Sequence, residues 1–175
     1  MGADMRTFKI FQLLSESATD ETELYRFHHP ATGLTRGLTT FHRQNVATGI
    51  FETAGQIDWL SDYNATVYFG LEEASHTCIS AANWQICRTD SRPRIEETQE
   101  DESRRFKVDG SEYKWKLATS NSGGLFCVDS RGKVIATWNQ EQSNLDVSPG
   151  AESILDRLVV TCFLNLWALR HLGQW

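Results

Sequence analysis

The stretch SILDRLVVTCFLNLWALRHL, residues 153–172, decides the fold that this sequence predicts. It is long enough for a helix of about five turns, and its polar residues are scattered around the helix axis. Asp156 and Asn165, for example, are separated by about two and a half turns and so point in opposite directions. A helix that is apolar nearly all round has to be enclosed. We therefore expect a buried central helix over about residues 150–172.

The chain before this helix reads as short β-strands separated by turn residues. The strongest signal is Asp109-Gly110, because Asp-Gly between two alternating segments is typical of a two-residue hairpin. In the second of these segments, Tyr113 and Trp115 face one side of the strand and Lys114 the other. Similar patterns predict strands over residues 7–13, 24–28, 34–43, 50–59, 66–69, 82–87, 104–108, 111–117, 125–128, 133–138 and 145–147.

A mostly β chain encloses an apolar helix most economically by curving or closing its sheet around it. We therefore expect a mainly β fold, a closed or nearly closed antiparallel β-barrel of about 10–12 strands around a buried hydrophobic C-terminal α-helix. At 175 residues, the range 1–175 fits a single domain. Residues 88–105 are dense in charge of both signs and poor in apolar residues, which predicts a mobile loop. This loop is either a solvated insertion or a docking arm.

Charge and hydropathy exclude several classes of partner. The net charge of −6 argues against a nucleic-acid-binding protein, because a phosphate-binding surface needs clustered Lys and Arg. Asp156, Arg157, Asn165 and Arg170 interrupt the C-terminal apolar run, so we expect no transmembrane segment. The first residues, MGADMRTFKIFQLL, lack the apolar core of a secretory signal. The sequence therefore predicts a cytoplasmic protein, with a membrane-peripheral location as the alternative.

The four cysteines show no C-x-x-C spacing. Cys127 lies in the apolar run LFCV and Cys162 in the apolar helix, so both are expected to be small core residues with reduced thiols. Cys78 and Cys87 flank Trp84 and could meet across a hairpin, but a cytoplasmic location does not favour a disulfide.

No catalytic signature stands out in this sequence. His28 and His29 precede a predicted turn, and His42 lies on a neighbouring strand, so three imidazoles near one barrel end are the candidates for catalysis. No carboxylate or cysteine falls at ligand spacing from them, and we predict no metal site and no cofactor. The sequence also contains no G-x-S-x-G elbow and no Gly-rich phosphate loop. These observations favour a protein that is not an enzyme.

Six segments of the chain form a recognisable pattern. They are FKVDGSEYKWK (106–116), LFCVD (125–129), VIATW (134–138), ILDRLVVT (154–161), LTTFHR (38–43) and IDW (57–59). Together they resemble an uncharacterised fungal domain family, whose members share a dG-x-x-Y-x-W strand pair, a viA-x-w strand and a closing lD-x-iv-x-T helix. That family is in turn similar to the tubby-like superfamily, which includes the LURP-one-related proteins and the phospholipid scramblases.

The resemblance implies a barrel of about a dozen strands threaded by a hydrophobic C-terminal helix. It supplies no activity, because this fold hosts more than one function. In tubby-like relatives a basic surface patch engages phosphoinositide head groups. The corresponding candidate here is a cluster that we call the basic face, formed by Lys107, Lys114, Lys116, Arg131 and Lys133 on adjacent predicted hairpins.

The sequence leaves two candidate functions. The first is a non-enzymatic intracellular binding module whose basic face engages anionic phospholipid head groups or a protein partner. The alternative is a small-molecule enzyme or carrier with a pocket at a barrel mouth, using His28, His29 and His42. A helix that fills the barrel disfavours the alternative, because it occupies the volume that lipocalin-type barrels give to a ligand.

Overall fold

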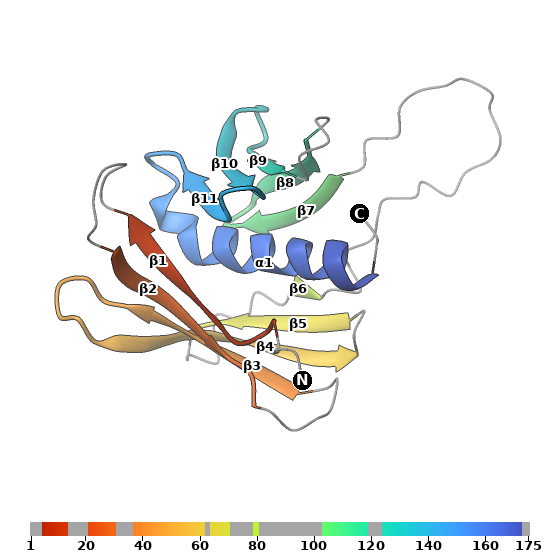
Figure 1. The fold of residues 1–175 in the computed structure, drawn as a ribbon. Helices are drawn as coiled ribbons and strands as arrows, with labels where there is room; N and C mark the ends of the chain where they lie inside the picture. The colour runs from red at the N-terminus through yellow and green to blue at the C-terminus, as the bar shows by residue number, and fades with distance from the viewer. Residues whose placement is uncertain are drawn as a thin grey trace, which may run out of the picture. The chain divides into compact units, whose positions relative to one another are not determined.

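A computed structural model describes residues 5–13, 21–30, 37–61, 64–70, 79–80, 103–118 and 124–172 of the chain (Figure 1). These residues form eleven strands and one α-helix, so the fold is mainly β, as predicted. The chain divides into two compact units, residues 1–83 and 84–175, and each contains one antiparallel sheet.

The first unit contains a six-stranded sheet in which every strand pairs with its neighbours in the sequence. Its order is β1-β2-β3-β4-β5-β6. Its strands are β1 (Phe8–Leu13), β2 (Glu21–His28), β3 (Gly37–Gln44), β4 (Phe51–Ser61), β5 (Asn64–Phe69) and β6 (Ile79–Ser80).

A row of aromatic residues crosses the buried face of this sheet. Phe8, Phe27, Phe41 and Phe69 are linked by direct cross-strand pairing, with Gly55 of β4 between the last two. Phe8 stacks on Phe27 at 4.4 Å between ring centroids, and Phe27 stacks on Phe41 at 5.4 Å. A side chain at Gly55 would collide with the Phe41 ring and the Tyr68 carbonyl, so the missing Cβ lets Phe41 reach Phe69 at 5.8 Å. These rings form the core of the unit.

The second unit contains a five-stranded sheet of order β11-β10-β9-β8-β7. Asp109 and Gly110 join β7 to β8 with φ values of 48° and 79°, the left-handed conformations that a two-residue type I′ turn requires. The predicted Asp-Gly hairpin is therefore confirmed. The strands are β7 (Ser103–Val108), β8 (Ser111–Leu117), β9 (Leu125–Val128), β10 (Val134–Asn139) and β11 (Asn144–Val147).

The C-terminal helix α1 (Leu155–Leu172) follows a short 3-10 turn, Glu152–Ile154. All eight residues from Leu158 to Asn165 are buried, and eight consecutive residues cover every side of a helix. The prediction of an enclosed helix is therefore confirmed. The helix begins later than residue 150 because Gly150 has a φ of 92°, outside the helical region.

Four other expectations are corrected or lie outside the described residues. The strands of the described ranges form two open sheets. In neither sheet does the first strand pair with the last, so no closed barrel is found among these strands. Residues 103–105 are the first residues of β7, so the expected strand over 104–108 is confirmed and the end of the expected loop 88–105 is wrong. The remainder of that loop, the expected strand over 82–87, Cys78 and Cys87 fall outside the described residues.

Candidate functional site

Strand alternation places three lysines of the basic face on one side of the second sheet. Lys107 of β7 lies beside the hairpin turn, and Lys114 and Lys116 follow on β8. Trp115, between the two β8 lysines, points to the opposite side and is fully buried. The predicted alternation of lysines and apolar residues on this strand is therefore observed.

A carboxylate already occupies part of this basic surface. Glu112 pairs directly with Lys107 across the two strands. Its side chain lies 3.2 Å from the guanidinium of Arg105 and 3.8 Å from the ammonium of Lys114. Arg105, which falls in both the expected strand over 104–108 and the expected loop 88–105, is thus an additional cation on this side of β7. The contacts of Glu112 lower the net positive charge of the surface.

Arg131 and Lys133 are held in the turn between β9 and β10. The Asp129 carboxylate accepts hydrogen bonds of 2.9 Å from both of their backbone N–H groups. Both side chains are exposed. Because Val128 pairs with Lys114, this turn emerges beside the start of β8, at the same end of the sheet as Asp109-Gly110. The structure therefore brings all five residues of the basic face to one sheet, three on its strands and two in one turn.

The three candidate histidines do not share a site. His28 and His29 are adjacent in the chain, and their side chains diverge as expected for an extended segment. His29 is buried, and its Nδ1 lies 2.9 Å from the Thr39 hydroxyl, which also accepts a 2.8 Å hydrogen bond from the Trp59 indole. This arrangement identifies His29 as part of the core. His28 and His42 both lie on the other face of the sheet.

A row of polar residues crosses this other face at successive cross-strand positions. Lys9 of β1 pairs with Arg26 of β2, Arg26 with His42 of β3, and His42 with Thr53 of β4. We call Lys9, Arg26 and His42 the basic row. Like charges directly opposite each other destabilise a sheet unless an anion lies between them. The same register therefore creates the aromatic row on one face and the basic row on the other.

Glu23 supplies one such anion. Its carboxylate accepts a 2.8 Å bond from the Lys9 ammonium and a 2.7 Å bond from the Arg26 Nε. These hydrogen bonds, the one from Arg26 first, hold the pKa of the Glu23 carboxyl below its usual value. The Arg26 guanidinium also lies 4.3 Å from the centre of the Phe51 ring. Two contacts thus fix the orientation of Arg26 before any ligand binds.

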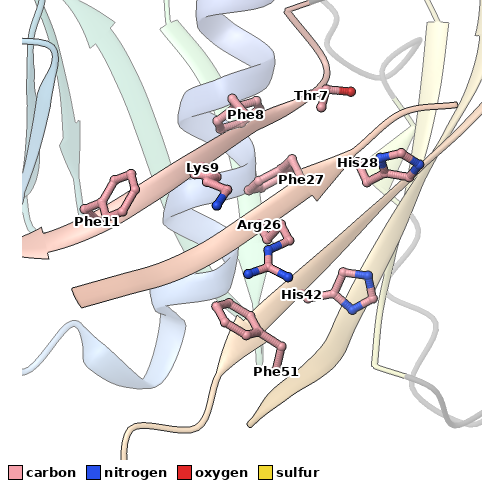
Figure 2. Close-up of a pocket in the computed structure, with 9 residues that line it drawn as sticks. All are labelled: Thr7, Phe8, Lys9, Phe11, Arg26, Phe27, His28, His42 and Phe51. Atoms are coloured by element: carbon pink, nitrogen blue, oxygen red, sulfur yellow. The ribbon is translucent and has the colours of Figure 1, made fainter. Parts of the chain in front are cut away.

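The basic row contributes three of the nine residues that line a hollow in the first unit (Figure 2). The hollow has a volume of about 820 Å³, within the usual range of ligand sites. Figure 2 shows the Arg26 side chain beside Phe51 and His42. Of the described residues that line it, none is an Asp or a Glu. Besides the basic row, its described lining residues are Thr7, Phe8, Phe11, Phe27, His28 and Phe51.

The sequence reading missed Lys9, Arg26, Phe11 and Phe51 as site residues. Their positions depend on the register of strands far apart in the chain and on two β-bulges, between Ile10 and Phe11 and between Phe41 and His42. The only sequence signal available was the alternation of Arg26 and His28 with the apolar residues of their strand.

Comparison with known proteins gives a family but no activity. The family model DUF6593, described as a family of unknown function, matches residues 12–171. No curated protein matches the chain. No solved structure matches it either. Across the described ranges, no helix combines the length and the apolarity that crossing a bilayer requires. The described side chains also include no group of three or more His, Cys, Asp or Glu that could hold a metal ion.

Proposed function

This chain belongs to the DUF6593 family of unknown function, and we propose that it is a non-enzymatic binding module for anionic lipid head groups. The observation that carries the proposal is the gathering of the basic face on one sheet of the second unit. Lys107, Lys114 and Lys116 share one side of the β7-β8 hairpin, and the exposed Arg131 and Lys133 extend from the neighbouring turn.

Electrostatics makes such binding compatible with the negative net charge of −6. Each Lys or Arg near an anionic membrane surface contributes about 1 kcal/mol of attraction. Repulsion from acidic residues elsewhere is screened beyond about 8–10 Å at physiological salt. Glu112 opposes the attraction, because it contacts Arg105 and Lys114. The proposal therefore predicts moderate, strongly salt-dependent affinity.

A relationship to the tubby-like superfamily is part of the same proposal. It is supported by the order of the elements, because eleven described strands precede a single helix with all of its sides buried. In that fold the strands would complete a closed barrel around the helix. A fungal source is part of the same proposal, because the family that the chain resembles is fungal. A cytoplasmic, membrane-peripheral location follows from the ligand, because the cytoplasmic leaflet carries the anionic lipids.

A small-molecule carrier or enzyme is the second candidate, and the hollow in the first unit is the observation that favours it. His28 and His42 line this hollow, whereas His29 lies in the core and has no place in such a site. We favour a carrier over an enzyme, because the described lining offers only the hydroxyl of Thr7, and no Ser, Cys or carboxylate, as a nucleophile beside the histidines.

Vesicle co-sedimentation tests the lipid proposal. The protein is mixed with vesicles of neutral phosphatidylcholine alone or with added phosphatidylserine and phosphoinositide, at low and at physiological salt. We expect sedimentation only with the anionic vesicles, and less of it as salt rises. Absence of sedimentation with phosphoinositide vesicles at low salt would remove the lipid proposal in favour of a protein partner or the small-molecule candidate.

A further inference from the structure

The hollow on the first sheet has the charge and the shape of a ligand site that is separate from the basic face. Its lining brings two permanent cations, Lys9 and Arg26, to one side of an open concave surface. Glu23 is the carboxylate that contacts both, and its single charge cannot neutralise the two. Lys9, Arg26 and Glu23 together therefore keep a positive charge at the hollow without any contribution from the histidines.

The donors of the basic row remain available beyond their contacts with Glu23. Lys9 gives one hydrogen bond to Glu23 and has three donors, and Arg26 gives one through Nε and has five. His42 Nδ1 lies 3.2 Å from the Thr53 hydroxyl, and this contact sets the ring orientation. The remaining donors of the basic row can therefore bind an acidic group while the contacts with Glu23 and Thr53 are kept.

Two aromatic side chains supply an apolar wall next to these donors. Phe11 is 46% exposed although it lies on a strand, and Phe51 carries the Arg26 guanidinium 4.3 Å above its ring. The exposed Phe11 ring and the half-buried Phe51 ring beside fixed cations favour a ligand that has both an apolar body and a negative charge. Because Arg26 is already held between Glu23 and Phe51, its side chain loses less conformational entropy when a ligand binds.

We propose that this hollow binds an organic anion with an apolar body, placing the acidic group on the basic row and the apolar body against Phe11 and Phe51. This inference specifies the ligand class of the small-molecule candidate. It is independent of the lipid proposal, because the two sets of residues lie in different units of the chain.

A matched pair of probes tests the inference on the full chain. 2-Naphthoate carries an aromatic body and a carboxylate, and 2-naphthylmethanol has the same body without the charge. Isothermal titration calorimetry should show 2-naphthoate binding at least tenfold more tightly than the alcohol. This affinity ratio corresponds to about one charge-assisted hydrogen bond. Equal affinity for the two probes, or no binding of 2-naphthoate at millimolar concentration, would overturn the inference.

Variants locate the binding. Lys9→Gln and Arg26→Gln should each weaken 2-naphthoate binding about tenfold, whereas Lys133→Gln on the basic face removes the same charge and should leave it unchanged. Lys9 is 52% exposed on its side chain, so its variant should fold even if Arg26→Gln does not. Both hollow variants should sediment with anionic vesicles as the parent chain does. Loss of 2-naphthoate affinity in Lys133→Gln, or its retention in Lys9→Gln, would contradict the assignment.

Discussion

The indole N–H of Trp115 donates a 2.9 Å hydrogen bond to the hydroxyl of Thr161, joining the middle of β8 to the middle of α1. Both side chains are fully buried. We expect Trp115→Phe and Thr161→Val each to lower the free energy of unfolding. The second change should cost about 1 kcal/mol less when the first is already present, because the hydrogen bond is then already lost. Urea unfolding of the two single variants and the double variant measures this coupling, and strictly additive losses would contradict it.

Gly55 is predicted to be intolerant of any side chain. An alanine Cβ would collide with the Phe41 ring and the Tyr68 backbone carbonyl, and a paired strand cannot move that carbonyl freely. Gly55→Ala should therefore cost about 3 kcal/mol or more. Gly70→Ala is the control, because its φ of 80° imposes backbone strain in open space, worth about 1–2 kcal/mol. Thermal or urea unfolding compares the two, and a smaller loss at Gly55 would refute the steric explanation.

Asn165 is fully buried on α1, and neither atom of its amide has a hydrogen-bond partner among the described residues. Replacing this side chain by the similarly sized leucine removes a desolvated polar group, so Asn165→Leu should raise the free energy of unfolding by about 1–3 kcal/mol. Asn165→Asp, which buries a charge at the same place, should destabilise the protein strongly. A loss of stability in the leucine variant would show that the amide is hydrogen-bonded.

The buried thiols should be unreactive in the folded protein. Burial raises the pKa of Cys127 to about 12 and that of Cys162 also well above its usual value. Because the thiolate is the reactive form, iodoacetamide at pH 8 should leave both unmodified until denaturant is added. Peptide mapping by mass spectrometry reads each cysteine separately, and native labelling of either at the rate seen in denaturant would contradict the prediction.

The same pKa shifts predict an alkaline limit to stability. A thiol whose pKa is raised by folding stays protonated in the folded state after the unfolded state has begun to ionise. For Cys127, stability should therefore be constant below the ordinary pKa of 9.0 and fall as the pH rises from there toward about 12. Urea midpoints measured from pH 7 to pH 11 check the direction. Cys127→Ala should show a shallower alkaline decline than the parent chain.

Local chemistry made much of this structure predictable. The enclosed helix followed from apolar residues on all its sides, and the β7-β8 turn followed from Asp109-Gly110, whose residues tolerate the left-handed conformation. The alternation of Lys114, Trp115 and Lys116 placed each on its observed side of β8. The separation of His28 from His29 was also implied by their adjacency, although the sequence reading grouped them.

Long-range register could not be predicted in the same way. The basic row exists because Lys9, Arg26 and His42 pair across three strands, and a shift of one residue would turn each to the other face. β-Bulges in β1-β2 and β3-β4 reset that register locally. The contact between the Phe41 and Phe69 rings also depends on register, because both residues pair with Gly55. Strand β6 (Ile79–Ser80) has only two residues, too few to give a periodic pattern.

Charge reversal on the basic face tests the proposed function most directly. Lys114→Glu combined with Lys116→Glu reverses two cations of the β7-β8 hairpin. Lys9→Glu combined with Arg170→Glu is the control, because it lowers the net charge equally through residues outside the basic face. Co-sedimentation with phosphoinositide vesicles at low salt should be abolished by the first pair and retained with the second. Equal binding by the two double variants would contradict a lipid site on the basic face.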